Sequence, residues 1–139
     1  ERAVKAGARF IVSPGLSTEV VEWCQDHGVP VIPGVATPTE VQQAIQLGLS
    51  LVKFFPAEAN GGAAALKAIS APFPSLKFMP TGGVNESNLG SYLSIPQVVC
   101  CGGTWMVPQE AVSRGDWRRI KELSLAASAL ALGANSGAK

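Results

Sequence analysis

Charged residues are scarce in this sequence, and several features that would indicate particular classes of protein are missing. Charged side chains make up 15% of the 139 residues, hydrophobic residues make up 47%, and the net charge is +1. This balance excludes a disordered chain and gives no strong field toward nucleic acid or an acidic membrane surface. No apolar run reaches the length that crosses a bilayer, and residues 1–5 do not resemble a signal peptide.

The sequence also has few residues that could form disulfides or bind a metal ion. The three cysteines, Cys24, Cys100 and Cys101, include an adjacent pair and no spacing typical of a disulfide framework or a zinc site. The only histidine, His27, directly precedes Gly28 at a predicted helix end, where it interacts favourably with the helix dipole. We therefore expect reduced thiols, a cytoplasmic location, and no metal or other cofactor.

The sequence does contain a repeat of short apolar runs, each bounded by glycine or proline and rich in β-branched or aromatic residues. Such runs are typical of buried parallel strands. Between them lie segments with helix-like periodicity and capping residues. The predicted strands cover residues 9–13, 29–32, 49–55, 76–79 and 97–101, and the predicted helices cover residues 16–27, 38–47, 61–69, 85–93 and 117–132.

This strand–helix unit occurs about five times, with a step of roughly 20 to 26 residues that is typical of α/β repeats. Two closures are possible, an open doubly wound sheet or a (β/α)₈ barrel. No Gly-x-Gly-x-x-Gly follows a strand, which disfavours a dinucleotide-binding sheet. Because a barrel needs eight strands, a barrel interpretation makes residues 1–132 a partial barrel that lacks about three N-terminal units, followed by a flexible tail at residues 133–139.

Lys53 is the first candidate for chemistry, because it lies inside the apolar strand at residues 49–55. Burial disfavours the charged form of a lysine and lowers its pKa toward neutrality. Strand alternation places Lys53 on the same face as Leu51 and Phe55, with Val52 and Phe54 on the other face. An uncharged amine is the nucleophile that Schiff-base formation requires. The alternative is a lysine that extends to solvent or pairs with Glu58.

Paired glycines follow the fourth and fifth predicted strands. Gly82 and Gly83 follow Pro80-Thr81, and Gly102 and Gly103 precede Thr104. Glycines let backbone N–H groups approach an anion without interference from a Cβ atom. Loops after the last two strands hold phosphate in many (β/α)₈ enzymes, so two such turns in succession favour a phosphate site. A plain tight turn is the alternative for either pair alone.

Other candidates are weaker. The turns Ser13-Pro14-Gly15 and Pro33-Gly34-Val35 line a pocket or simply reverse the chain. Glu58 lies just past a strand. Three roles are open for it: a residue at the mouth of the site, a partner of a site residue, or a surface residue. The basic residues near position 118 are interpreted as a solvated helix face, and the tryptophans as packing residues. Those basic residues are Arg114, Arg118, Arg119 and Lys121, and the tryptophans are Trp23, Trp105 and Trp117.

Taken together, these pieces resemble the 2-keto-3-deoxy-6-phosphogluconate (KDPG) aldolases, also called KHG/KDPG aldolases. The resemblance covers nearly the whole chain up to about Leu132, and the segment around Lys53 is its most specific part. The matching pieces are Val12-Ser13-Pro14-Gly15-Leu16, Val31-Ile32-Pro33-Gly34-Val35, Val52-Lys53-Phe54-Phe55-Pro56-Ala57-Glu58-Ala59-Asn60-Gly61-Gly62, Pro80-Thr81-Gly82-Gly83-Val84 and Gly102-Gly103-Thr104-Trp105.

The resemblance implies a (β/α)₈ barrel that assembles as a homotrimer and reversibly cleaves KDPG to pyruvate and glyceraldehyde 3-phosphate. Lys53 matches the family's Schiff-base lysine. Positions that contact the substrate match Pro14, Phe55 and Thr81, and the phosphate-binding backbone matches Gly82, Gly83 and Gly103. Thr104 stands where relatives often have serine, and either hydroxyl can donate to phosphate.

The resemblance also implies that part of the catalytic machinery lies elsewhere. The family's general-base glutamate and the residues that hold the keto-acid carboxylate belong to N-terminal strands, and the match begins in the helix before the fourth barrel strand. No glutamate among Glu1, Glu19, Glu22 and Glu58 matches the base position. The chain is therefore interpreted as a fragment. The alternatives are an aldolase for 4-hydroxy-2-oxoglutarate or a phosphogalactonate-type substrate, and a non-catalytic fragment that binds sugar phosphates.

Overall fold

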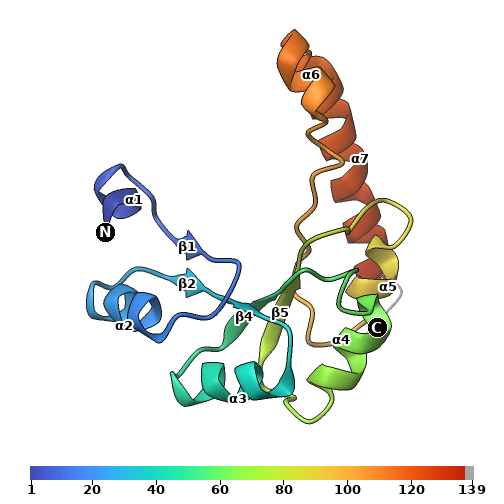
Figure 1. The fold of residues 1–139 in the computed structure, drawn as a ribbon. Helices are drawn as coiled ribbons and strands as arrows, with labels where there is room; N and C mark the ends of the chain where they lie inside the picture. Colours follow the sequence, from blue (N-terminus) through green and yellow to red (C-terminus); the bar gives the residue numbers. More distant parts are fainter. Residues whose placement is uncertain (137–139) are drawn as a thin grey trace.

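A computed structural model describes residues 1–136 of the protein (Figure 1). Short helices and short strands alternate along most of this length, as the repeat of apolar runs predicts. The elements are α1 (Arg2–Lys5), β1 (Ile11–Val12), α2 (Thr18–Asp26), β2 (Val31–Ile32), β3 (Gly34–Val35), α3 (Pro38–Gln46), β4 (Leu51–Phe54), α4 (Gly62–Ser70), β5 (Lys77–Pro80), α5 (Leu89–Leu93), α6 (Gln109–Arg114) and α7 (Trp117–Ser136).

All strand pairs are parallel, and within each of two sheets the strands follow chain order. β1 pairs with β2, and β3, β4 and β5 form a three-stranded sheet in that order. Pro33 separates β2 from β3, because proline has no N–H for the ladder. The predicted strand at residues 97–101 pairs with β5 at one isolated bridge, Phe78 with Val98, and a second bridge, Thr81 with Gly102, lies just beyond both segments. An order that does not reverse disfavours the doubly wound sheet, in which ligands bind where the order reverses.

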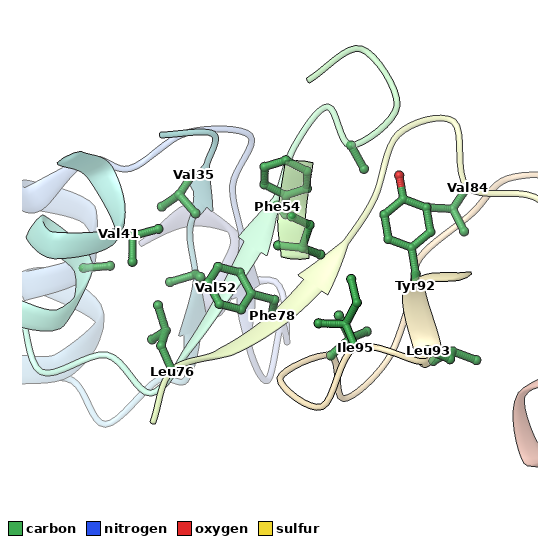
Figure 2. Packing of buried hydrophobic residues seen from close by; sticks show 14 of the residues in the cluster. Val35, Val41, Val52, Phe54, Leu76, Phe78, Val84, Tyr92, Leu93 and Ile95 are labelled. Atoms are coloured by element: carbon green, nitrogen blue, oxygen red, sulfur yellow. The ribbon is translucent and has the colours of Figure 1, made fainter. Parts of the chain in front are cut away.

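The hydrophobic core lies on one face of the sheet. Val52 and Phe54 of β4 and Phe78 of β5 are fully buried there, beneath α3, α4 and α5 (Figure 2). The alternate residues Leu51, Lys53 and Met79 are only half-buried, because they point to the opposite, open face. This alternation is the one predicted for a strand covered by helices on one side.

The structure departs from the predicted helices in three places. The helix expected at residues 85–93 is helical only in α5, and α6 was not predicted. α7 continues to Ser136 rather than ending at Leu132, so it takes in part of the predicted tail at residues 133–139. The last three residues of that tail lie outside the described residues.

α6 and the first half of α7 project away from the sheet, whereas the second half of α7 packs beside α5 (Figure 1). Ala127 of α7 is buried there. Within residues 1–136, no helix is long and apolar enough to span a membrane.

Candidate active site at the carboxyl ends of the strands

Lys53 lies in the middle of β4 on the open face of the sheet. Its Cα atom pairs with Gly34 of β3 and Met79 of β5, and its N–H donates to the carbonyl of Pro33 at 2.8 Å. The side chain is half-buried, whereas both sequence neighbours are fully buried on the other face. The strand thus presents a primary amine on a surface that its own core does not use.

The amine of Lys53 contacts the ring of Phe55. The Nζ atom of Lys53 lies 4.0 Å from the centroid of the Phe55 ring. An ammonium group over an aromatic face gains about 0.5–1 kcal/mol at exposed sites. The ring therefore favours a side-chain conformation that keeps the amine over the sheet and toward the carboxyl end of β4.

Pro14 lies one strand away from the amine. The turn after β1 packs so closely on β3 that a Cβ atom at Gly34 would lie 2.0 Å from the Pro14 carbonyl oxygen. Gly34 in turn pairs directly with Lys53. Glycine at position 34 is therefore what lets the Pro14 turn approach the strand that neighbours the amine.

Thr81 directly follows β5, in register with Met79 of that strand. Its N–H donates to the carbonyl of Phe54 at 3.0 Å, which fixes its backbone against β4. Its Oγ1 atom is buried and has no hydrogen-bond partner among the described residues. Because an unpaired buried hydroxyl is costly, this group is suited to a polar ligand atom.

Gly82 and Gly83 turn the chain away from β5 with φ angles of +93° and +84°. This left-handed region favours glycine, because a Cβ atom would clash with the backbone. The Gly83 carbonyl accepts hydrogen bonds from the side-chain amides of Asn85 and Asn88, at 3.2 and 3.1 Å. The turn is thus fixed by two asparagines that follow it.

The second glycine turn lies beside the first. Gly102 forms a bridge with Thr81, and a Cβ atom at Gly103 would lie 1.9 Å from the indole ring of Trp105. Across the described residues, no group accepts a hydrogen bond from the N–H of Gly82, Gly83, Gly103 or Thr104. Unpaired N–H groups in neighbouring turns are donors that suit an anion.

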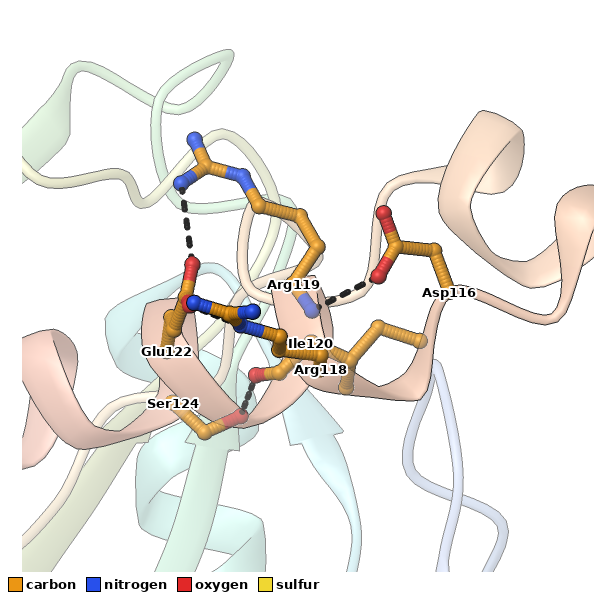
Figure 3. Close-up of polar contacts among 6 residues, drawn as sticks. All are labelled: Asp116, Arg118, Arg119, Ile120, Glu122 and Ser124. Carbon is orange, nitrogen blue, oxygen red and sulfur yellow. Dashed lines mark hydrogen bonds and ion pairs between the residues drawn. The ribbon is translucent and has the colours of Figure 1, made fainter.

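The basic residues near position 118 do not join this site. Arg118 pairs with Glu122 at 3.0 Å and its side chain is 90% exposed, while Arg119 lies 3.9 Å from the same carboxylate (Figure 3). Arg114 pairs with Glu110 at 2.9 Å. These helical pairs confirm the interpretation of a solvated helix face.

His27 lies at the opposite end of the sheet. It is the C-cap residue of α2, just before the amino end of β2, and its ring stacks on Trp23 at 4.0 Å. Its Nδ1 atom lies 2.7 Å from the Trp23 carbonyl. No cluster of three or more metal-ligating side chains occurs in the part of the chain that the structure describes.

Glu58 has a partner that the sequence did not reveal. Its carboxylate accepts a hydrogen bond from the hydroxyl of Tyr92, which is 34 residues away in the sequence. Burial, followed by this hydrogen bond, raises the pKa of the Tyr92 hydroxyl above its usual range. No local pattern links the two residues, so only the folded chain brings them together.

The site therefore combines a half-buried primary amine, an unpaired hydroxyl and two turns with unpaired N–H groups at one edge of a parallel sheet. This combination suits a carbonyl compound that also carries an anionic group. A family model described as "Aldolase: KDPG and KHG aldolase" matches residues 1–123. The chain belongs to this aldolase family.

Relatives in the KDPG and KHG aldolase family match most of this chain, but the chain matches only part of them. The 2-dehydro-3-deoxy-phosphogluconate aldolase of Treponema pallidum is 47% identical over 124 residues, which is 89% of this chain and 59% of the relative. The chain thus spans less than two thirds of the length of the curated relatives that it matches.

Solved structures of KDPG aldolases also match most of this chain. A KDPG aldolase from Legionella pneumophila, with pyruvate captured as a covalent carbinolamine intermediate, superimposes with a TM-score of 0.83 at 48% identity, over 86% of this chain and 58% of that one. The 2-keto-3-deoxy-6-phosphogluconate aldolase of Zymomonas mobilis with 3-phosphoglycerate gives a TM-score of 0.75 at 40% identity, over 78% of this chain and 52% of that one.

Proposed function

We propose that residues 1–132 form about the last five βα units of a (β/α)₈ aldolase barrel. The KDPG aldolases that this fold resembles are barrels. Parallel strands in unbroken chain order support the proposal, because a barrel adds each strand beside the previous one. The half-buried face that carries Lys53 is then the interior face of the barrel.

The proposed reaction is the reversible cleavage of 2-keto-3-deoxy-6-phosphogluconate to pyruvate and glyceraldehyde 3-phosphate. The observation that carries this proposal is the place of the Lys53 amine, over the Phe55 ring and beside two turns of unpaired N–H groups. The amine fits the ketone of a keto acid, and the turns fit a phosphate.

The chemical step begins when the unprotonated Nζ atom of Lys53 attacks C2 of the substrate. Loss of water from the carbinolamine gives an iminium, which draws electrons from the neighbouring bonds. A base removes the proton of the C4 hydroxyl, the C3–C4 bond breaks, and its electron pair forms an enamine as the aldehyde leaves. Protonation of the enamine at C3 and hydrolysis of the imine release pyruvate and restore the amine.

The remaining residues bind and orient the substrate. Pro14 and Phe55 border the pyruvate end, and the buried Thr81 hydroxyl bonds a substrate oxygen. Phosphate binds to the N–H groups of the turns at Gly82, Gly83, Gly103 and Thr104, which sets the register of the reacting carbons. We assign the general base to no glutamate of this chain, in agreement with the resemblance, which places it in N-terminal strands.

The unpaired N–H groups favour a phosphorylated substrate over 4-hydroxy-2-oxoglutarate, which carries carboxylates but no phosphate. Two adjacent turns offer more donors than a single carboxylate needs, whereas a phosphate has three terminal oxygens to satisfy. Comparing cleavage rates of the two substrates by an enzyme containing this chain tests the preference. Faster turnover of 4-hydroxy-2-oxoglutarate would contradict it.

Borohydride trapping tests the imine directly. The intact protein that contains this chain is incubated with pyruvate and borohydride, and the adduct is located by peptide mass spectrometry. We expect an adduct on Lys53 that is lost in Lys53→Met. Lys77→Met is the matched control, because Lys77 lies on the same face of the neighbouring strand, and it should retain the adduct. An adduct at another lysine, or phosphate binding with no adduct, would refute the assignment and favour the non-catalytic alternative.

Two further predictions concern the whole protein. The homotrimer is proposed on the resemblance alone, and the cytoplasmic location is proposed on the three cysteines, which lack the spacing of a disulfide framework. Sedimentation velocity of the protein that contains this chain measures the first, and fractionation of the source cells measures the second. A monomer at micromolar concentration would contradict the trimer.

A further inference from the structure

Glu58 contacts the Gly82–Gly83 turn through both its backbone and its side chain. Its N–H donates to the carbonyl of Gly82 at 3.0 Å. Its side chain fills the space beside the next residue, since a Cβ atom at Gly83 would lie 2.5 Å from Cγ of Glu58. A single residue in the turn after β4 thus borders both glycines of the turn after β5.

The backbone contact determines which way the turn points its donors. In a trans peptide the carbonyl and the following N–H point in opposite directions. When the Gly82 carbonyl accepts from Glu58, the N–H of Gly83 is directed to the other side of the turn. This N–H is one of the groups that have no partner among the described residues and that we assign to phosphate.

Tyr92 holds the side chain of Glu58 in place. Its hydroxyl donates to the Glu58 carboxylate, and the whole residue is buried in the core beside Val84 (Figure 2). The carboxylate also borders the start of α4, where a Cβ atom at Gly62 would lie 3.3 Å from Oε1. The anchor is rigid, because Tyr92 belongs to α5 and packs in the main hydrophobic cluster.

We propose that Glu58 and Tyr92 are positioning residues for the phosphate site: Tyr92 anchors Glu58, and Glu58 holds the Gly82–Gly83 turn with its N–H groups directed at the ligand. The proposal rests on the proposed function, since it assumes that this turn binds phosphate. It gives Glu58 a role outside proton transfer, because its carboxylate is engaged by Tyr92 rather than directed at Lys53. Loss of either side chain weakens phosphate binding without affecting the imine.

Binding is measured on the 139-residue chain with 3-phosphoglycerate as the probe and glycerate as the matched compound without phosphate. Amide signals of the glycines report the site in two-dimensional nitrogen–proton spectra. For the unaltered chain we expect 3-phosphoglycerate, and not glycerate, to shift the signals of Gly82 and Gly83.

Four variants separate positioning from general stability. Tyr92→Phe and Glu58→Ala remove the anchor and should raise the dissociation constant for 3-phosphoglycerate by roughly threefold to tenfold, the effect of one lost hydrogen bond. Glu58→Gln retains an oxygen that accepts from Tyr92 and should stay within about twofold. Ser70→Ala, which also deletes one buried hydroxyl but at the far end of α4, should have no effect on binding.

Trapping of pyruvate on Lys53 by borohydride is repeated for each variant and should be unchanged, because pyruvate has no phosphate. Unaltered 3-phosphoglycerate affinity in Glu58→Ala and Tyr92→Phe would overturn the proposal while leaving the aldolase function intact. If Tyr92→Phe does not fold, the comparison of Glu58→Ala with Glu58→Gln decides. No shift at Gly82 or Gly83 in the unaltered chain would overturn the phosphate site and this proposal together, whereas loss of trapping alone concerns only the imine.

Discussion

Replacing Glu40 with alanine is expected to destabilise the protein near neutral pH, because one carboxylate oxygen holds the start of α3. Oε2 of Glu40 accepts from the N–H of Ala36 at 2.8 Å, and from the N–H and Oγ1 of Thr37 at 2.9 Å each. Thr37 reciprocates through Oγ1, which completes a capping box. The loop that this box fixes leads from β3, the strand beside Lys53, into α3.

The magnitude follows from the groups left without a partner. Loss of a helix cap typically costs about 1 kcal/mol, and the N–H and hydroxyl of the exposed Thr37 regain water at little cost. Ala36 is partly buried, so its N–H regains water less readily. We therefore expect Glu40→Ala to lower the free energy of unfolding by roughly 1–2 kcal/mol, and Glu40→Gln by about half as much, since its amide oxygen still accepts.

The effect should depend on pH. The hydrogen bond from Ala36 lowers the pKa of Glu40 below its ordinary value of 4.5, burial opposes the shift, and the bonds from Thr37 add to it. A carboxyl with a lowered pKa in the folded state stabilises the fold above its unfolded pKa, and this contribution is lost as the pH falls through the folded value. The difference between the unaltered chain and Glu40→Gln should therefore be full above about pH 5 and shrink below about pH 4.

Urea denaturation followed by circular dichroism, repeated across this pH range, measures the difference directly. Thr37→Ala serves as the matched variant, because it removes the reciprocal bond and leaves the carboxylate in place. A difference between Glu40→Gln and the unaltered chain that stays constant from neutral pH to below pH 4 would refute the argument. So would a Glu40→Ala variant as stable as the unaltered chain.

Three other outcomes are expected. Gly34→Ala should lower the free energy of unfolding by roughly 1–3 kcal/mol in urea denaturation and reduce borohydride trapping, because its Cβ atom would clash with the Pro14 backbone. Gly15→Ala is the matched control: a Cβ atom there has no neighbour within 4 Å, so both assays should be unchanged. Phe54→Ala should cost about 3–5 kcal/mol in the same denaturation assay, because the ring is fully buried, and a loss below about 1 kcal/mol would contradict the packing. Burial, followed by the adjacent thiol of Cys100, raises the pKa of Cys101 to about 12. Alkylation of Cys101 by iodoacetamide, read by mass spectrometry, should therefore be slow at about pH 8 and accelerate with rising pH. Rapid modification of Cys101 at about pH 8 would contradict this.

The sequence predicted the features that depend on local pattern. The alternation of β4 placed Lys53 opposite the core, and the burial of Val52 and Phe54 confirms that placement. The helix predicted at residues 38–47 begins where α3 does, at Pro38, because the fixed φ angle of proline suits the first position of a helix. The paired glycines marked both turns: Gly82 and Gly83 adopt positive φ angles, and Gly102 and Gly103 lie too close to neighbouring side chains to carry a Cβ atom.

Features that depend on competing or distant interactions were missed. The helix predicted at residues 85–93 begins only at Leu89, because the side chains of Asn85 and Asn88 hydrogen-bond to nearby backbone groups and compete with helix formation. α6 was missed although Gly115 marks its end, because a six-residue helix gives little periodicity. The bond between Glu58 and Tyr92 joins two elements through the core, and no local pattern encodes it.

The indole of Trp105 covers Gly103 so closely that no side chain fits beneath it. The protein therefore carries an intrinsic fluorophore at one of the turns assigned to phosphate. The other two indoles have unlike surroundings, since Trp23 stacks on His27 and Trp117 is 65% exposed. With phenylalanine at both of those positions, the emission of a single indole would report ligand binding at the Gly103 turn in real time, without a coupled enzyme or an attached dye.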